Sequence, residues 1–196
     1  MSPQVDLERR DAIRSAARQL FFQFGFSKTS MEDIARQSGL AKASIYYYYT
    51  NKEAIFHEVV LEEAQGFLSE IINNLPQDAP ADEKLKAFIA LSYQELKVFA
   101  EKMADVPLHY CEHSPHGAPM IRELDEFFRR EMAILIEEGN RSGIWTHDAD
   151  MISQTVIFMT EFLNHAWMRS FPEELRDRVI ETMIDIILNG LRRRNI

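Results

Sequence analysis

The sequence predicts an all-α protein. Gly and Pro are scarce, with seven of each in a chain of 196 residues. No segment combines sustained apolar-polar alternation with glycine-rich turns, which is the pattern of strands. Apolar residues recur instead at intervals of three and four, which indicates amphipathic helices. We expect a small helical domain over residues 1–52 and a larger one over residues 53–196.

Two helices are expected at the start of the chain. One runs from Leu7 to Phe24 and stops at Gly25, because a glycine at this position commonly closes a helix. Ser30 can accept a hydrogen bond from a first-turn amide, so Ser30 to Asp33 reads as a capping-box-like start of a short second helix. That helix is expected to end at Gly39.

A third helix is expected over Lys42–Tyr48, only three residues after the second helix. A helix, a short turn containing glycine and another helix form the helix-turn-helix pattern. The first domain is therefore expected to be a three-helix unit of this kind.

The second domain is expected to hold five further helices. Pro76 and Pro80 mark a loop after the first of them, and the segment from Asp105 to Pro119 is the most broken part of the chain. The expected helices lie at about 54–73, 81–103, 120–140, 148–170 and 172 to between 190 and 194.

Charge is divided unevenly between the two expected domains. The formal net charge is −9, yet residues 1–52 hold eight Lys and Arg against five Asp and Glu. The other residues hold 14 basic and 26 acidic side chains. A basic module on an acidic body favours a polyanion such as nucleic acid as the partner of the first domain.

We expect a cytoplasmic protein with no membrane partner. The chain has no run of eighteen apolar residues, and its start lacks the apolar region of a secretory signal. A single cysteine, Cys111, excludes an internal disulfide and fits a reducing compartment.

Four consecutive tyrosines, Tyr46–Tyr49, end the third expected helix. At 100° per residue, Tyr49 shares the face of Ile45 and should pack inward. Tyr47 points away from that core, and the other two tyrosines flank it. Because a solvated face rarely carries a large aromatic ring, we favour contact with DNA over plain exposure for Tyr47.

This helix has the residue types that a DNA groove requires. Tyrosine rings can lie against sugars and donate hydrogen bonds to phosphate oxygens. Ser44 offers a hydroxyl that pairs with several bases, and Ala43 offers a methyl group suited to thymine. Lys42 and Lys52 bracket the helix and supply cations.

The segment TSMEDIARQSGLAKASIYYYYTNKEAIF, Thr29–Phe56, resembles the N-terminal domain of the TetR family of bacterial one-component regulators. The preceding AARQLFFQFGF, Ala16–Phe26, is similar to the family's first helix and glycine turn. The resemblance covers about the first 56 residues, and beyond them only the layout of helices agrees. Three residues depart from the family pattern: Ala41 replaces a capping Ser, Ala43 a common Gly and Tyr49 a common Phe.

The resemblance implies a ligand-gated dimeric repressor that binds palindromic double-stranded operator DNA. It implies that the recognition helix lines the DNA and that residues at the two ends of the helix-turn-helix hold phosphates. The expected DNA-binding residues are Thr29, Ser30, Lys42, Ala43, Ser44, Tyr46, Tyr47, Tyr48 and Lys52.

The last two helices are too apolar for one buried face each. Apolar residues of the last helix cover about 220°, whereas one core-facing stripe needs only about 100°. A two-fold homodimer through a four-helix bundle explains the excess, and the alternative is a wholly buried central hairpin. The expected interface residues are Ile157, Val179, Ile180, Met183, Ile184, Ile187 and Leu191.

The resemblance also implies a ligand cavity among the middle helices, although aromatic and Met residues at helical spacing are often plain core. An apolar, Met-rich interior favours a small apolar or aromatic effector. The candidate pocket residues are Phe88, Phe99, Met103, Tyr110, Phe128, Met132, Phe158 and Phe162.

The segment His109–His116 is the one candidate metal site. His109 and His113 are four residues apart and would share a helix face, with His116 nearby, so a metal-sensing regulator is the alternative function. An exposed, solvated loop is the simpler interpretation, and no cofactor is expected. The chain carries no phosphate-binding glycine loop, nucleophile elbow or His-Glu-x-x-His motif, so we expect no catalytic residues and no enzymatic activity.

Overall fold

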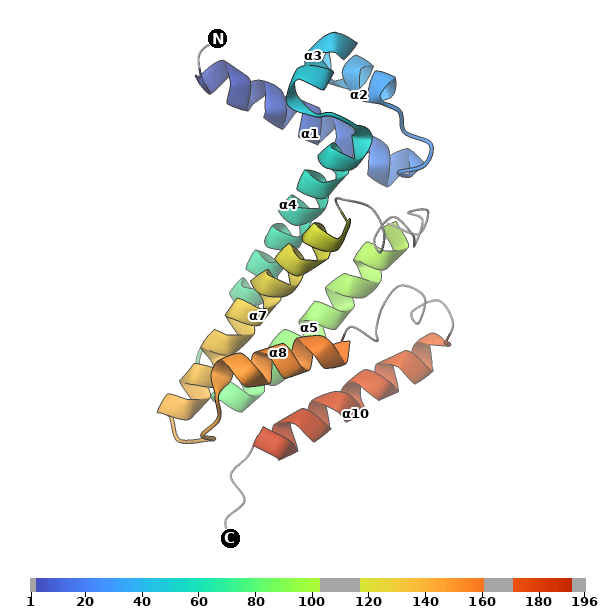
Figure 1. The fold of residues 1–196 in the computed structure, drawn as a ribbon. Coiled ribbons are helices and arrows are strands. Elements are labelled where there is room, and N and C mark those ends of the chain that lie inside the picture. The colour runs from blue at the N-terminus through green and yellow to red at the C-terminus, as the bar shows by residue number, and fades with distance from the viewer. Residues whose placement is uncertain (1–2, 103–116, 161–170, 192–196) are drawn as a thin grey trace. The chain divides into compact units, whose positions relative to one another are not determined.

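The computed structural model in Figure 1 describes residues 3–102, 117–160 and 171–191. Every regular element in these ranges is an α-helix, which confirms the predicted fold class. None of these helices is long and apolar enough to cross a bilayer. The helices are α1 (Pro3–Phe24), α2 (Met31–Ser38), α3 (Lys42–Tyr48), α4 (Lys52–Asn73), α5 (Ala81–Lys102), α7 (Gly117–Arg141), α8 (Ala149–Thr160) and α10 (Glu173–Leu191).

Two helices begin earlier than the sequence predicts, and proline explains both differences. The first helix starts at Pro3 rather than Leu7, and α7 starts at Gly117 rather than Met120. Proline is tolerated in the first turn of a helix because the N–H that it lacks has no partner there. Pro119 therefore lies inside the first turn of α7 instead of ending the preceding loop.

The chain separates into two compact units. The first unit is Met1–Ala64 with Glu101–Glu123, and the second is Gln65–Ala100 with Leu124–Ile196. Helix α4 thus contributes its first half to one unit and its second half to the other. The domain division at residue 52 stays a prediction.

The first unit is built on α1, α2, α3 and the start of α4. Ile13, Ile34, Ile45 and Ile55, one from each helix, are fully buried. Phe21, Phe26 and Phe56 complete the core with ring centroids 4.7 to 5.6 Å apart. Burial of one apolar residue from each helix fixes α3 against α1 and α2.

The turns of the helix-turn-helix follow the predicted local chemistry. Ser30 caps α2 in a capping box with Asp33, and Gly39 ends α2 at a φ of 71°. Only glycine adopts this left-handed conformation without cost from a side chain. Ala41, by contrast, gives α3 no side-chain cap, as its methyl group predicts.

The second unit packs α5, α8 and α10 against parts of α4 and α7. Trp145 is a fixed point of its core, because its indole is fully buried and Nε1 donates to the carbonyl oxygen of Ile136 at 2.8 Å. The ring lies against Gly139, where a Cβ atom would stand only 2.1 Å from the indole. The turn after α7 is therefore locked by one aromatic side chain that requires a glycine beneath it.

Candidate nucleic-acid interface

Helix α3 presents an exposed face to solvent. Ile45 is fully buried and Tyr49 is 3% exposed, so the inward face predicted for these two residues is confirmed. Tyr47 is 73% exposed and Tyr46 is 48% exposed. Lys42 and Ala43 are also exposed, whereas Ser44 and Tyr48 are half-buried. The outer face of α3 therefore combines two aromatic rings, one cation and a small side chain.

The two hydroxyl residues before α2 are engaged within the protein. Thr29 is buried, and its hydroxyl donates to the carbonyl oxygen of Gly25 at 2.8 Å. The Ser30 hydroxyl donates to Asp33 Oδ2 at 2.6 Å and accepts from the Asp33 amide at 3.2 Å. These bonds from Ser30, followed by Arg36, lower the pKa of the Asp33 carboxyl. Of these two hydroxyl residues, only Ser30 is exposed.

The two predicted lysines differ in their surroundings. Lys42 is exposed, and its Nζ lies 3.3 Å from Glu32 Oε2, which is a weak surface pair that a phosphate can replace. Lys52 Nζ donates to the carbonyl oxygens of Phe26 and Thr29 at 2.7 and 2.9 Å, and it lies 4.2 Å from the centre of the Phe26 ring. Lys52 therefore closes the loop between α1 and α2, which the sequence did not indicate.

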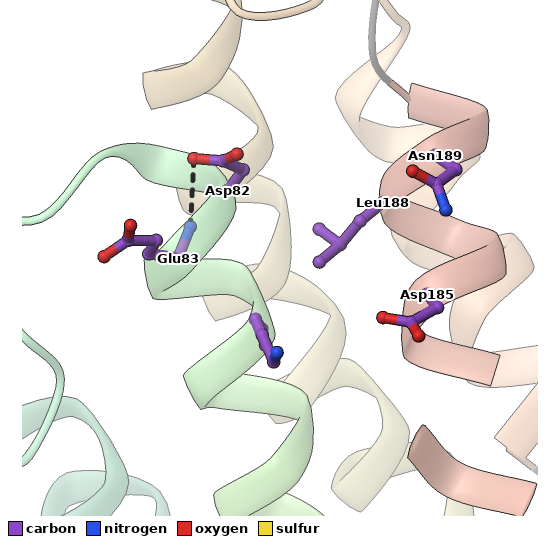
Figure 2. A pocket seen from close by; sticks show the side chains of 6 residues that line it. Asp82, Glu83, Asp185, Leu188 and Asn189 are labelled. Atoms are coloured by element: carbon purple, nitrogen blue, oxygen red, sulfur yellow. Dashed lines mark hydrogen bonds between the residues drawn. The ribbon is translucent and has the colours of Figure 1, made fainter. Parts of the chain in front are cut away.

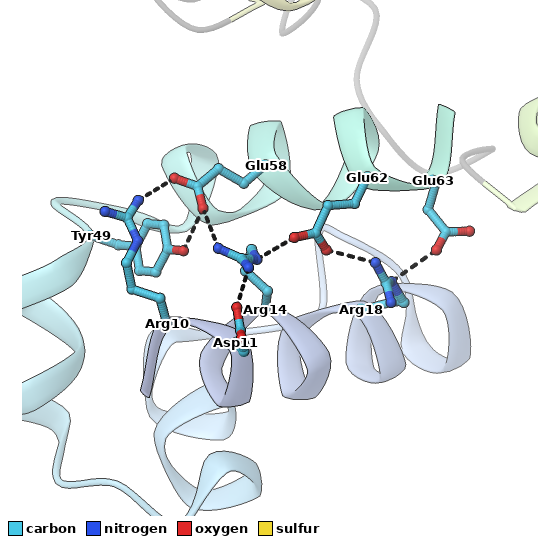
Figure 3. A network of polar contacts seen from close by, with 8 residues as sticks. All are labelled: Arg10, Asp11, Arg14, Arg18, Tyr49, Glu58, Glu62 and Glu63. Atoms are coloured by element: carbon cyan, nitrogen blue, oxygen red, sulfur yellow. Dashed lines mark hydrogen bonds and ion pairs between the residues drawn. The ribbon is translucent and has the colours of Figure 1, made fainter. Parts of the chain in front are cut away.

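A row of ion pairs joins α1 to the first half of α4 (Figure 3). We call it the α1–α4 ladder: Arg10, Arg14 and Arg18 on one side, and Glu58, Glu62 and Glu63 on the other. Arg10 and Arg14 pair with Glu58, Arg14 and Arg18 with Glu62, and Arg18 with Glu63. The nitrogen–oxygen distances are 3.1 Å for Arg14 and Glu58, and 2.7 and 2.8 Å from Arg18 to Glu62 and Glu63. Arg14 also pairs with Asp11.

Tyr49 attaches the end of α3 to this ladder. Its hydroxyl donates to Glu58 Oε2 at 2.6 Å, and the Arg10 guanidinium lies 5.1 Å from its ring centre. Burial and the bond to Glu58 raise the pKa of Tyr49. For Glu58, burial opposes a lower pKa, but the Tyr49 hydroxyl and the Arg10 charge outweigh it and lower the pKa of the carboxyl. The hydroxyl that distinguishes Tyr49 from phenylalanine thus links α3 with α4.

The ladder also corrects the charge argument from the sequence. The eight basic residues of the first 52 include three that pair with carboxylates of α4, all beyond residue 52. Residues 1–64 hold eight Lys and Arg against nine Asp and Glu. The local basic surplus is therefore neutralised within the first unit, and hydroxyl and aromatic groups dominate the exposed face of α3.

The predicted pocket residues that the structure describes have different surroundings. Phe88 and Met132 are buried in the core, with the Phe128 ring 6.4 Å from Phe88, while Phe158 is 59% exposed. Phe99 meets Phe67 edge to face at 6.2 Å. The other three candidates, Met103, Tyr110 and Phe162, lie outside the described residues.

A shallow polar pocket lies between α5 and α10 (Figure 2). It has a volume of about 260 Å³ and is lined by none of the predicted residues. Five of its six lining residues are charged or polar, and Leu188 is the apolar one. The lining residues are Asp82, Glu83, Lys86, Asp185, Leu188 and Asn189.

Helix α10 has two apolar faces, which the broad apolar arc had indicated. Residues on one face pack into the core of their own chain, namely Ile180, Ile184, Ile187, Leu188 and Leu191. A second face, about 120° away at 100° per residue, is exposed or half-buried and holds Leu175, Val179, Thr182, Met183, Ile186 and Gly190. Of the predicted interface residues, Ile157, Ile180, Ile184, Ile187 and Leu191 are thus buried within one chain. Of the other two, Val179 is exposed on the outer face, and Met183 is half-buried at its edge and also packs against the core.

The histidine segment lies outside the described residues, and so does Cys111. This includes all three candidate ligands, His109, His113 and His116. In the ranges 3–102, 117–160 and 171–191, no three His, Cys, Asp or Glu side chains are grouped to hold a metal ion.

Comparisons with known proteins agree with this architecture. Residues 13–59 match the family model described as "Bacterial regulatory proteins, tetR family". Over 95% of its length the chain is 26% identical to the HTH-type transcriptional regulator RutR of Escherichia coli K12, covering 92% of RutR. Over 93% it is 23% identical to the HTH-type transcriptional repressor KstR2 of Rhodococcus jostii RHA1, covering 91% of that repressor.

Solved structures share the fold along the whole chain. The structure of the fatty acid degradation regulator FadR from Bacillus halodurans is similar with a TM-score of 0.67 and 22% identity, covering 99% of both chains. A transcriptional regulator from Cytophaga hutchinsonii gives a TM-score of 0.73 and 20% identity, covering 98% of this chain and all of the other. The likeness thus extends beyond residues 13–59 to the helices of the second unit.

Proposed function

The chain belongs to the TetR family of bacterial regulatory proteins, and we propose that it is a cytoplasmic, dimeric repressor that releases palindromic operator DNA when a small effector binds. Helix α3 lies in the major groove in this proposal, and the two α3 helices of the dimer read half-sites about 34 Å apart. The exposure of Tyr47, 73% on the outer face of α3, carries the proposal. A large aromatic side chain held in water at that position gains contact area when a DNA backbone covers it.

The proposed DNA contacts follow the exposure of each residue. Tyr46, Tyr47, Ala43 and Lys42 face outward on α3, with Ser44 at the edge of that face. Ser30 lies at the start of α2, where amide N–H groups of the first turn favour phosphate oxygens. Thr29 and Lys52 are proposed as residues that shape the loop before α2, because their polar atoms bond to backbone carbonyls there.

The proposed dimer uses the outer faces of α8 and α10. On α8, the exposed residues Met151, Thr155 and Phe158 recur at intervals of four and three, which forms one stripe. The Thr155 hydroxyl donates to the carbonyl oxygen of Met151, and that of Thr182 on α10 donates to Arg178. Both hydroxyls are thus satisfied within their own helices, so these faces can be buried without an unpaired donor.

The proposed effector is apolar or aromatic. The half-buried rings of Phe67 and Phe99 meet edge to face, and the half-buried ring of Phe128 lies beside fully buried Phe88. Rings that are neither fully packed nor fully exposed can rearrange around an apolar molecule. Native mass spectrometry of the purified protein tests this point. A co-purifying apolar compound supports it, whereas a bound hydrophilic metabolite contradicts it.

DNA binding is tested with Tyr47→Ala and a matched control. Full-length protein selects duplexes from a random-sequence pool, and fluorescence anisotropy then gives Kd for the selected duplex. We expect Tyr47→Ala to weaken binding about tenfold or more, the usual cost of one lost direct contact. Phe24→Ala removes another exposed aromatic, 53% exposed at the end of α1, and should leave Kd unchanged. Equal affinity of the Tyr47→Ala variant and the wild type would refute the role of α3.

A further inference from the structure

The third tyrosine of α3, Tyr48, is connected to the start of the chain. The Tyr48 hydroxyl donates to Asp6 Oδ1 at 2.9 Å, and Asp6 lies in the first turn of α1. The Tyr48 ring meets the Tyr47 ring edge to face, with centroids 5.0 Å apart and planes at 87°. A continuous path of contacts thus runs from Asp6 through Tyr48 to the most exposed ring of α3.

The bond to Asp6 uses the one proton that Tyr48 can donate. Burial raises the pKa of the Tyr48 phenol, and the bond to Asp6 raises it further, while Arg9 acts in the opposite direction. The phenol is therefore protonated at neutral pH and remains a donor. A phenol has a single O–H group. While Tyr48 donates this O–H group to Asp6, it cannot donate the same group to a DNA phosphate as the sequence predicts.

Asp6 itself is an unexpected residue beside a surface that faces phosphates. A carboxylate near the DNA backbone repels it, and this lowers affinity by an amount that salt reduces. If Asp6 nevertheless favours DNA binding, the favourable effect must come from the Tyr48 side chain that it holds in place. Edge-to-face aromatic pairs have a preferred geometry, so an anchored Tyr48 restricts the orientations open to Tyr47.

We propose that Asp6 is a positioning residue for DNA recognition, which anchors Tyr48 and thereby fixes the exposed ring of Tyr47 before DNA arrives. This inference rests on the proposed function. Restricting the ring in advance reduces the conformational entropy that binding would otherwise remove. Tyr48 acts as a strut between α1 and Tyr47, and Tyr47 makes the contact.

Three substitutions separate this role from two simpler ones. Asp6→Asn removes the negative charge but keeps an oxygen that accepts from Tyr48, whereas Asp6→Ala removes both. If Asp6 were only a repelling surface acid, both variants would bind DNA more tightly. If Tyr48 were a phosphate donor, Asp6→Ala would release its hydroxyl and strengthen binding, and Tyr48→Phe would weaken it. If Asp6 positions Tyr47 through Tyr48, then Asp6→Ala and Tyr48→Phe both weaken binding and Asp6→Asn does not.

The experiment measures Kd of the full-length variants for the duplex selected by the wild type. We expect Asp6→Ala and Tyr48→Phe each to weaken binding by up to about tenfold, the cost of immobilising one otherwise free side chain on binding. The double variant should be no weaker than either single one, and Asp6→Asn should match the wild type or bind more tightly. Glu8→Ala removes an exposed acid two residues further along α1 and controls for charge alone.

The decisive measurement is the effect of Asp6→Ala on Kd in a protein that already carries Tyr47→Ala. There Asp6→Ala should have no further effect on Kd, since the ring that it positions is gone, whereas general damage to α1 would weaken binding in both backgrounds. An equal loss in both backgrounds overturns the proposal, as does an Asp6→Ala variant that binds as tightly as Glu8→Ala. A wild-type protein that selects no duplex overturns the proposed function, and the positioning role fails with it.

Discussion

Gly139→Ala should destabilise the protein, although the same substitution in most helices stabilises it. Alanine in place of glycine inside a helix gains about 1 kcal/mol. At position 139, however, the added Cβ would lie 2.1, 2.2 and 2.4 Å from three atoms of the Trp145 indole. Ordinary contacts between carbon atoms are about 3.5 Å, so the ring must move by more than about 1 Å.

The indole has no easy way to move. It is fully buried, and its Nε1–H donates to Ile136. Overpacking of a core costs about 1–3 kcal/mol, and a buried donor that loses its partner adds about 1–3 kcal/mol. After the helix gain of about 1 kcal/mol is subtracted, we expect Gly139→Ala to lower the free energy of unfolding by about 1–5 kcal/mol.

Urea unfolding followed by circular dichroism measures this change, with all variants at one protein concentration because the proposed dimerisation would add to apparent stability. Gly66→Ala is the matched control, since Gly66 lies inside α4 and a Cβ there would meet nothing within 4 Å. That variant should gain about 0.5–1 kcal/mol. If both variants gained stability, Trp145 could not lie against α7 as described.

Two further changes test the ladder and the dimer. Glu58→Gln should lower the free energy of unfolding by about 1 kcal/mol at pH 7, because the lost carboxylate accepts from Tyr49 and pairs with Arg10. The folded-state pKa of Glu58 lies below its ordinary value of 4.5, so the full difference in unfolding free energy should be present above pH 4.5. Urea titrations at lower pH should show this difference shrink as Glu58 becomes protonated. A difference that does not change with pH would contradict the pairing. Ile186→Arg places a charge on the outer face of α10, where Ile186 is 62% exposed, and sedimentation velocity should show a monomer. Glu181→Lys, on the polar side of the same helix, should remain dimeric, and a dimeric Ile186→Arg would exclude this face as the interface.

Local features of the first unit could be predicted from the sequence. Three of these features depend only on neighbours within a few residues along the chain. They are the cap at Ser30, the left-handed Gly39 and the missing cap at Ala41. Helical periodicity also separated the buried Tyr49 from the exposed Tyr47, although Tyr49 is the extended C-cap residue that follows α3 rather than a part of the helix.

Contacts between distant segments could not be predicted in this way. Lys52 bonds to carbonyls 26 and 23 residues away, so its charge alone suggested a phosphate ligand. Tyr48 and Asp6 are 42 residues apart, and their bond depends on how α1 crosses α3. A local sum of charges likewise missed the ladder, because the acids that neutralise Arg14 and Arg18 come from another helix.

The broad apolar arc of α10 agrees with its two apolar faces, but it did not show which face packs into the core of its own chain. Periodicity gives the width of an apolar surface, whereas the split between Ile184 in the core and Ile186 outside depends on where α10 docks. The candidate interface therefore moved by about 120° around the helix once its packing was known.

The α1–α4 ladder has a consequence for how such a regulator searches a genome. Non-specific attraction to DNA comes mainly from the release of counterions by cations that reach phosphates, and its strength follows the number of such cations. With three arginines held by glutamates of the same unit, few charges are left to drive that release. Encounters with unrelated sequences should then be brief, and the time spent at an operator would depend on the fit of hydroxyls and aromatic rings rather than on charge.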